Sequence, residues 1–200
     1  MIILINISRD ILLLLLFKDT LFNKSKKFNL KKILIISDTH SYVDNKIINY
    51  VKQADQVWHA GDLGNIEVLE KIEKISKTIA VYGNIDNQLI RSELKEYEIF
   101  YCEGIKVLMI HIAGKPPYYN KKTIRLIKNE RPKILVYGHS HILKVIFDKK
   151  NELLLINPGA AGRHGFHKKR TMIRFEINGN SIQNMEIIEL GQRSKLPDSV

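Results

Sequence analysis

The apolar stretch Ile33–Ile36 constrains the fold most, because it is too short for a helix and rich in β-branched residues. Such a run is typical of a strand buried on both faces of an α/β sheet. Asp38 and His40 follow it directly. Ligands bind beyond the carboxyl ends of strands in open α/β sheets, and residues two apart in extended chain point the same way. Asp38 and His40 are therefore expected to face one ligand, although a turn aspartate beside a surface histidine would give the same pattern.

The first half of the chain alternates between short apolar runs and amphipathic segments. Strands are expected at 33–36, 56–59 and 78–82, with helices at 43–51 and 66–73 between them. In the first helix, Val43, Ile47, Ile48 and Val51 share one face. Strands joined through helices pair in parallel, because a parallel pair needs a crossover connection. The expected fold class is therefore α/β, with a βαβαβ first half.

The second half is richer in strands. A hairpin is expected from 98–102 and 105–110, because the short turn Glu103-Gly104 separates the two apolar runs. A helix is expected at 119–128 after Pro116-Pro117, and further strands at 133–137, 143–147, 153–156, 171–177 and 181–188. Asn178-Gly179 is a strong hairpin signal between the last two strands.

The expected domain covers residues 31–190, between an extension at 1–30 and a polar tail at 191–200. Within the extension, Ile11–Phe17 is apolar but far shorter than the roughly 20 residues that span a bilayer. It also lacks the basic start and cleavage site of a secretory signal. We therefore expect no membrane span, and interpret 1–30 as a loosely held extension or a misassigned start. A weak interfacial helix is the competing interpretation.

The amino-acid composition indicates the cellular compartment and the class of binding partner. A single cysteine, Cys102, excludes an internal disulfide and favours a reducing compartment, so we expect a cytoplasmic protein. The formal net charge of +11 raises a nucleic-acid or membrane partner as an alternative. The lysines are scattered through Ile- and Asn-rich sequence, however, so nucleic acid is not the favoured partner.

Five of the predicted strands end in side chains that can bind a metal ion. The residues at these strand ends are Asp38 and His40, Asp62, Asn84, His111, and His139 with His141. Each has an ordinary explanation by itself: a turn aspartate, a helix cap or a core histidine. Their coincidence at five strand ends favours a shared metal site. Mixed Asp, Asn and His donors suit Mn²⁺, Fe²⁺, Zn²⁺ or a similar divalent ion.

The order of these motifs resembles a known family. Asp-x-His, Gly-Asp, Gly-Asn-x-Asp, a strand-terminal His and Gly-His-x-His follow the order of the calcineurin-like metallophosphoesterases. The closest likeness is to small single-domain bacterial and archaeal phosphodiesterases of that superfamily. Asn157-Pro158-Gly159-Ala160 is similar to their downstream Asn-Pro-Gly-Ser turn, and the resemblance covers about residues 32–190.

The resemblance implies a β-sandwich flanked by helices, in four layers, with a two-metal site at the strand ends. It implies that one ion is held by Asp38, His40, Asp62 and His141, and the other by Asp62, Asn84, His111 and His139. Asp62, Asn84 and His111 would stand at the catalytic centre, where a hydroxide bridging the two ions is the expected nucleophile. Mn²⁺ is the expected ion, and Fe²⁺, Zn²⁺, Ni²⁺ and Mg²⁺ are alternatives.

Two departures from the family pattern concern the leaving group. Many relatives carry a histidine in the Gly-Asn motif, where this chain has Ile85, and many have His-Gly-His where it has His111-Ile112-Ala113. A general acid for the leaving group is therefore expected to be missing. The loop Arg163–His167 supplies either a substrate-binding cation or a solvated basic loop, and His59 is interpreted as structural.

The expected function is metal-dependent hydrolysis of small phosphodiesters. A nuclease or nucleotide phosphatase of the same superfamily is an alternative that the basic charge mildly favours. A non-catalytic scaffold is another, since the retromer subunit with this fold is thought to work mainly through its surfaces. A homo-oligomer also stays open.

Overall fold

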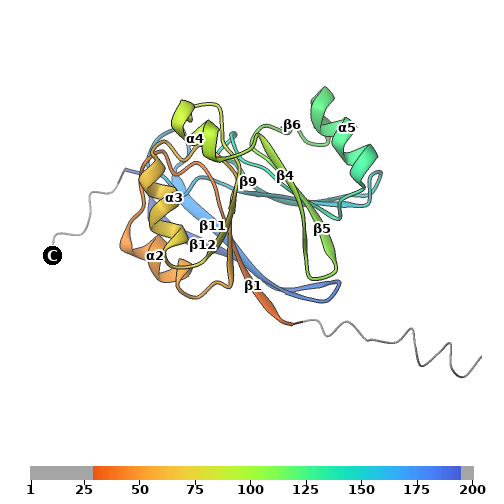
Figure 1. Ribbon diagram of the computed structural model, residues 1–200, viewed down its shortest axis with the longest axis horizontal. Coiled ribbons are helices and arrows are strands. Elements are labelled where there is room, and N and C mark those ends of the chain that lie inside the picture. The colour runs from red at the N-terminus through yellow and green to blue at the C-terminus, as the bar shows by residue number, and fades with distance from the viewer. Residues whose placement is uncertain (1–28, 195–200) are drawn as a thin grey trace, which may run out of the picture.

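In the computed structural model, which describes residues 29–194, all but two short strands form two five-stranded sheets packed face to face, with helices on their outer faces (Figure 1). The strand order is β12-β11-β1-β2-β3 in the first sheet and β4-β5-β8-β10-β9 in the second. The predicted sandwich flanked by helices is confirmed. Most of the expected extension, residues 1–28, and the end of the expected tail, 195–200, lie outside the described residues.

The first sheet carries the predicted parallel βαβαβ unit. Its strands are β1 (Lys31–Ile36), β2 (Gln56–His59), β3 (Lys77–Ala80), β11 (Lys169–Asn178) and β12 (Ser181–Gln192). β2 pairs in parallel with both β1 and β3, whereas β1 pairs antiparallel with β11. The helices α2 (Asn45–Val51) and α3 (Ile66–Glu73) pack on this sheet.

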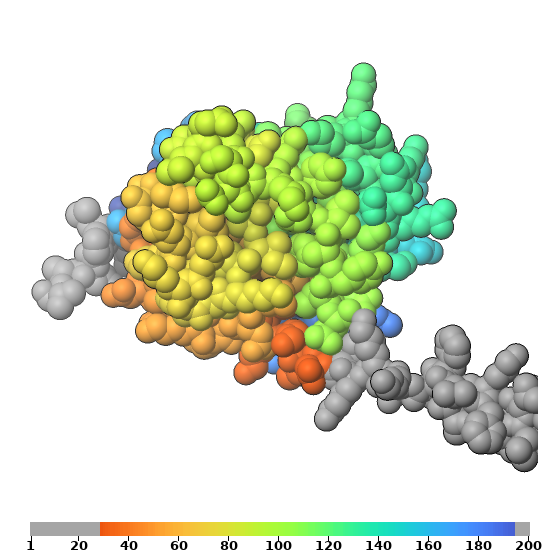
Figure 2. Space-filling view, in the orientation of Figure 1, coloured from red at the N-terminus to blue at the C-terminus, as the bar shows by residue number. Residues whose placement is uncertain are grey.

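The second sheet comes mostly from the second half of the chain. Its strands are β4 (Tyr97–Cys102), β5 (Ile105–Ile110), β8 (Ile134–Val136), β9 (Leu143–Asp148) and β10 (Leu153–Pro158). The predicted hairpins β4–β5 and β11–β12 are both confirmed by antiparallel pairing. Helix α5 (Lys121–Glu130) packs on the outer face of this sheet. On the face seen in Figure 2, the first half in orange and yellow lies beside the green β4–β5 hairpin.

Strand β1 lies at the centre of the packing, as its apolar run predicts. Ile33 and Ile35 are buried in the core between the two sheets, where Trp58 also packs. Leu34 and Ile36 point the other way and pack with the buried faces of α2 and α3. Alternate residues of one strand therefore join two hydrophobic layers, which fixes the position of the residues that follow the strand.

Several boundaries differ from the sequence-based expectations. The third strand ends at Ala80 rather than at residue 82, because Val81 makes only an isolated bridge to Lys95. α2 begins at Asn45, since the Asp44 side chain accepts a hydrogen bond from the Ile47 N–H and caps the helix there.

Other segments were not expected. The short helix α4 (Gln88–Glu93) and the two-residue strands β6 (Gly114–Lys115) and β7 (Tyr118–Tyr119) were not predicted. β12 runs to Gln192, beyond the expected domain end at residue 190. Among residues 29–194, no helix is long and apolar enough to cross a membrane.

Candidate metal centre

All seven predicted site residues lie in loops that follow strands at one end of the sandwich. The first sheet supplies Asp38 and His40 after β1, Asp62 after β2 and Asn84 after β3, and the second sheet supplies His111 after β5 and His139 with His141 after β8. Since the two sheets face each other, these loops converge from both sides. The site is therefore built across the sandwich and depends on the packing between the sheets.

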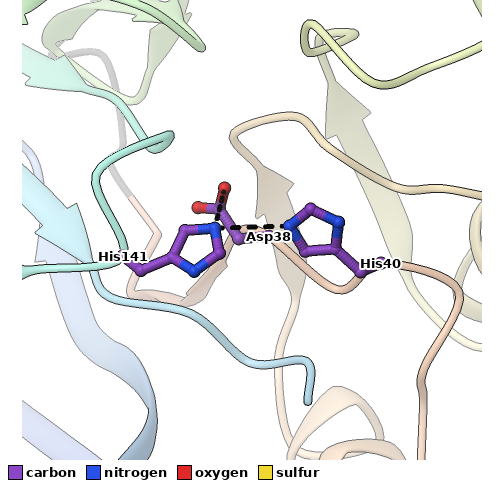
Figure 3. A group of neighbouring side chains, drawn as sticks. All are labelled: Asp38, His40 and His141. Carbon is purple, nitrogen blue, oxygen red and sulfur yellow. Dashed lines mark hydrogen bonds and ion pairs between the residues drawn. The ribbon is translucent and has the colours of Figure 1, made fainter. Parts of the chain in front are cut away.

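One group of side chains consists of Asp38 and His40, from the loop after β1, and His141, from the loop after β8, which point toward one another (Figure 3). His141 Nε2 lies 3.2 Å from Asp38 Oδ1 and 3.3 Å from His40 Nε2. Asp38 is fully buried, and the two histidines are partly buried. Three potential ligand atoms from two sheets thus face one small space.

A second group consists of Asp62, His111 and His139, and Asn84 lies against it. His111 Nε2 lies 3.2 Å from Asp62 Oδ1 and 3.1 Å from Asn84 Oδ1. The His111 and His139 rings meet edge to face, with centroids 5.4 Å apart. The structure therefore brings the other four predicted residues together as well.

Asp62 connects the two groups. One carboxylate oxygen, Oδ1, faces His111, whereas the other, Oδ2, lies 3.8 Å from His40 Nε2 in the first group. Within each group the ligand atoms lie within 4.8 Å of one another, close enough for a single ion to contact them. Carboxylate, amide and imidazole donors together suit divalent ions of hard to borderline character. The residues of each group thus fit a divalent metal ion, and the Asp62 carboxylate reaches both groups.

A backbone hydrogen bond on the side facing away from Asp62 and Asn84 orients the His111 ring. Its Nδ1 donates to the Ala60 carbonyl oxygen at 2.7 Å, which leaves the Nε2 lone pair facing the site in the neutral ring. Such an outer hydrogen bond is the usual way in which a protein fixes a metal-binding histidine. Burial alone would lower the pKa of His111, but the Asp62 carboxylate, with Asp38, outweighs burial and raises it. The Asp62 and Asp38 carboxylates thus favour positive charge at this ring, and the same carboxylates would favour a cation in the site.

The backbone at the site is unusual. Five of the seven residues adopt left-handed conformations: φ is 53° at Asp38, 45° at His40, 55° at Asp62, 68° at His139 and 57° at His141. Positive φ is uncommon outside glycine, although Asp and His tolerate it better than most residues. Backbone held in such regions clusters at functional sites, where the surrounding structure enforces it. The loops are therefore shaped to present these side chains.

Several supporting residues have no ligand role. Asp86 is buried, and its carboxylate accepts hydrogen bonds from the Gly64 N–H at 2.8 Å and the Gly83 N–H at 2.7 Å. Arg91, on the unpredicted helix α4, donates to the backbone oxygen of Asn84 at 3.0 Å. Asp86 stands in the Gly-Asn-x-Asp motif, so the sequence signals it, whereas Arg91 carries no such signal.

His59 lies outside both groups, in agreement with the structural role expected for it. It is fully buried; its Nδ1 accepts from the Gly61 N–H at 3.2 Å, and its Nε2 lies 3.0 Å from Thr39 Oγ1. Burial lowers its pKa to about 4, against the opposing effect of Asp86. A neutral His59 therefore ties the loop after β2 to the loop after β1.

The basic loop after the Asn-Pro-Gly turn lies against the site. His167 Nδ1 is 3.2 Å from His141 Nδ1, and the His164 ring centroid is 5.0 Å from that of His40. On the other side, a cavity of about 270 Å³ opens beside Asn84 and His111. Ile85 and Ile112, at the two departures from the family pattern, are 46% and 39% exposed.

Comparison with known proteins connects this geometry to a family. The model of the calcineurin-like phosphoesterase superfamily domain matches residues 32–180. A probable metallophosphoesterase from Methanocaldococcus jannaschii is 30% identical over 132 residues, which span 63% of this chain and just under two thirds (66%) of that protein.

Solved structures share the fold. A novel archaeal phosphodiesterase superposes with a TM-score of 0.62 at 23% identity, over 80% of this chain and 99% of its own. Vps29 from Entamoeba histolytica, complexed with Zn²⁺, gives a TM-score of 0.61 at 17% identity, over 79% of this chain and 98% of its own. The family model spans every strand of the two sheets except β12 and includes every strand end that carries a predicted ligand. The chain therefore belongs to the calcineurin-like phosphoesterase superfamily.

Proposed function

We propose that this chain is a phosphodiesterase that uses two divalent metal ions. The observation that carries the proposal is the position of Asp62, whose two carboxylate oxygens face different groups of ligand side chains. A carboxylate in that position can bridge two cations roughly 3.5–4 Å apart. In this proposal the ions are held by the two overlapping sets that the family resemblance implies: Asp38, His40, Asp62 and His141, and Asp62, Asn84, His111 and His139.

Mn²⁺ is the proposed ion, with Fe²⁺, Zn²⁺, Ni²⁺ and Mg²⁺ as alternatives. When bound, two such ions supply an activated water as nucleophile and positive charge for the phosphoryl oxygens. The chain's own residues hold the ligand atoms in place. Ala60 fixes the His111 ring, and the Ile85 N–H donates to Asp62 Oδ1 at 3.1 Å, which orients the carboxylate. Asp62, Asn84 and His111 thereby form the proposed catalytic centre.

Two observations support a diester rather than a monoester substrate. The archaeal phosphodiesterase shares this fold. In addition, the partly exposed side chains next to the ligands Asn84 and His111 are the apolar Ile85 and Ile112. An apolar neighbour suits the esterified arm of a diester better than the second negative charge of a monoester. A small phosphodiester is therefore the proposed substrate, and the single free cysteine, Cys102, supports a cytoplasmic location.

The test is turnover by metal-depleted protein to which each of the five ions is added in turn. We expect metal-dependent hydrolysis of a bis-aryl phosphodiester, fastest with Mn²⁺, and slower hydrolysis of the aryl monoester. The matched control is Asp55→Ala, because Asp55 is a carboxylate remote from the site that caps the start of β1. Absence of turnover with every ion would favour the scaffold alternative. Faster hydrolysis of single-stranded DNA, RNA or nucleotides than of aryl diesters would favour the nuclease or nucleotide phosphatase alternative.

A further inference from the structure

His167 belongs to neither ligand group but contacts one of them. It follows the Asn-Pro-Gly turn in the loop between β10 and β11, and its ring meets that of His141 edge to face, with centroids 5.1 Å apart. The two Nδ1 atoms are 3.2 Å apart, and His167 Nε2 lies 3.1 Å from the Gly162 carbonyl oxygen. A continuous line of hydrogen bonds thus runs from a backbone carbonyl, through His167, to a proposed metal ligand.

The carbonyl at the end of this line determines the direction of every bond in it. A carbonyl oxygen only accepts, so His167 Nε2 carries the proton, and in the neutral ring its Nδ1 is an acceptor. His141 Nδ1 must then donate to His167 Nδ1. The neutral His141 ring is left with a lone pair on Nε2, the nitrogen that faces Asp38 and His40.

The Gly162 carbonyl is itself held by the metal site. The Gly162 N–H donates to the Asp38 backbone oxygen at 3.0 Å, and a side chain at position 162 would collide with the backbone of Asp38 and Thr39. The circuit therefore begins and ends at Asp38, since the Asp38 carboxylate faces His141 Nε2. Because the circuit is closed, the positions of Asp38 and His141 depend on each other.

The loop is also shaped to bring His167 against His141. Gly165 has a φ of +117°, and a Cβ there would collide with the His141 ring. Arg193, just beyond β12, donates from Nε to the His167 carbonyl oxygen at 3.1 Å. Gly165 thus allows the loop to lie close to the His141 ring, and the hydrogen bond from Arg193 holds His167 in place.

We propose that His167 is a positioning residue that holds His141 in the tautomer and orientation that present Nε2 to the metal ion. The proposal rests on the proposed function only in taking His141 as a ligand. His167 acts through His141 and does not itself contact the ion. Outer partners of metal-binding histidines contribute roughly 10–100-fold to metal affinity.

The first measurement needs neither metal nor activity. Long-range ¹H–¹⁵N spectra of the metal-depleted protein distinguish a protonated Nδ1 from a protonated Nε2. We expect His141 to be protonated on Nδ1 in the wild type and to populate both tautomers in His167→Leu. In His167→Gln the amide oxygen can accept from His141 and the amide nitrogen can donate to Gly162, so the wild-type tautomer is expected to return. Protonation of the neutral His141 ring on Nε2 rather than on Nδ1 in the wild type would overturn the proposal.

The second measurement is Mn²⁺ affinity by calorimetry. We expect His167→Leu to bind about 10–100-fold more weakly than the wild type, and His167→Gln to recover most of that loss. Phe166→Leu is the matched control, because Phe166 lies in the same loop but its side chain is fully exposed. Affinity in that variant should stay close to the wild-type value. An equal loss in both leucine variants would show a general effect of the loop and would overturn the specific role of His167.

His141→Leu separates this proposal from the proposed function. Weak binding by His141→Leu together with unchanged binding by His167→Leu would leave the ligand assignment standing and overturn the positioning role. Unchanged Mn²⁺ binding by His141→Leu would instead overturn the ligand assignment, and with it the functional basis of the proposal.

Discussion

At the scale of single residues, Asp62 differs from the other proposed ligands because its two oxygens face different groups. Replacing it with alanine is therefore expected to weaken binding of both ions, whereas His40→Ala affects one. We expect Asp62→Ala to lose at least about 100-fold in turnover, since the ions contribute several kcal/mol and each 1.36 kcal/mol is about tenfold. His40→Ala should lose less. Metal content and turnover of both variants are the measurements, and full occupancy with full turnover in Asp62→Ala would contradict the two-metal assignment.

Ile85 leads to a prediction about the leaving group. It stands where many relatives carry a histidine, and its side chain offers no proton. General acid catalysis is typically worth about 10²–10⁴-fold, so without it the leaving oxygen departs with its charge poorly neutralised. We expect a steep fall in rate as leaving-group pKa rises, with slow turnover of alkyl diesters, and partial recovery on those substrates in Ile85→His. Rates across a series of diesters that differ only in leaving-group pKa test this. A flat series would mean that another group, such as His164, His167 or water, delivers the proton.

The residues at the centre of the site could be predicted because each follows an apolar strand, and this pattern can be read directly from the amino-acid sequence. Arg91 could not, since it acts through backbone carbonyls that the fold brings near it. Asn157 illustrates the same limit: the motif marks it, but only the structure shows its side chain donating to the Gly138 oxygen at 2.9 Å. The proposed ligands thus have a signal in the local sequence, whereas the residues that orient them are recognised mostly from their tertiary contacts.

At the scale of elements, His59 at the end of β2 makes stability depend on pH. Burial lowers its folded-state pKa to about 4 from an ordinary value of 6.5. Between those two values the unfolded chain binds the extra proton, so the free energy of unfolding falls as pH drops from 6.5 to 4. We expect this slope to be shallower in His59→Gln, measured by denaturant unfolding of metal-depleted protein. His40, His111 and His167 are retained in both proteins, so most of the difference between the two slopes is assigned to His59. Identical slopes would contradict the assignment.

Elements of different length differ in how well the sequence predicts them. The strands of the sandwich repeat an apolar pattern long enough to recognise, and most are placed within a few residues. Helix α4 spans only Gln88–Glu93 and buries a single residue, Ile90, so it has no amphipathic stripe to detect. Strands β6 and β7 have two residues each and depend on pairing with one another. Helix α4 and strands β6 and β7 were therefore not predicted, because they are stabilised mainly by contacts with neighbouring segments.

At the scale of the whole molecule, the domain is expected to fold without residues 1–30. The family model begins at residue 32, and β1 begins at Lys31. We expect the truncated chain to melt within about 4 °C of the full chain, since each kcal/mol shifts the midpoint by only about 2–4 °C at this size. Metal-dependent turnover should be unchanged. A fall in melting temperature of more than about 8 °C would show that the segment packs on the domain.

The arrangement of the two sheets could be predicted only in part. The parallel order of β1, β2 and β3 follows from their crossover helices, because such connections admit few topologies. The neighbour of β1 on its other side is β11, which lies far along the chain, with Ile35 opposite Ile173. Nothing local in either strand specifies that partner. The family resemblance implied the sandwich, and the pairing within it comes from the structure.

Five proposed ligands occupy backbone conformations that glycine adopts freely and other residues resist. Stability and activity therefore favour different amino acids at the same positions, because glycine would relax each loop while removing a ligand. A gene copy released from selection for catalysis would be free to drift toward glycine or asparagine at those of these sites where the side chain holds no backbone group in place. A copy still selected for turnover would retain aspartate and histidine there. These five positions would thus separate lineages of working hydrolases from lineages of scaffolds on the same fold.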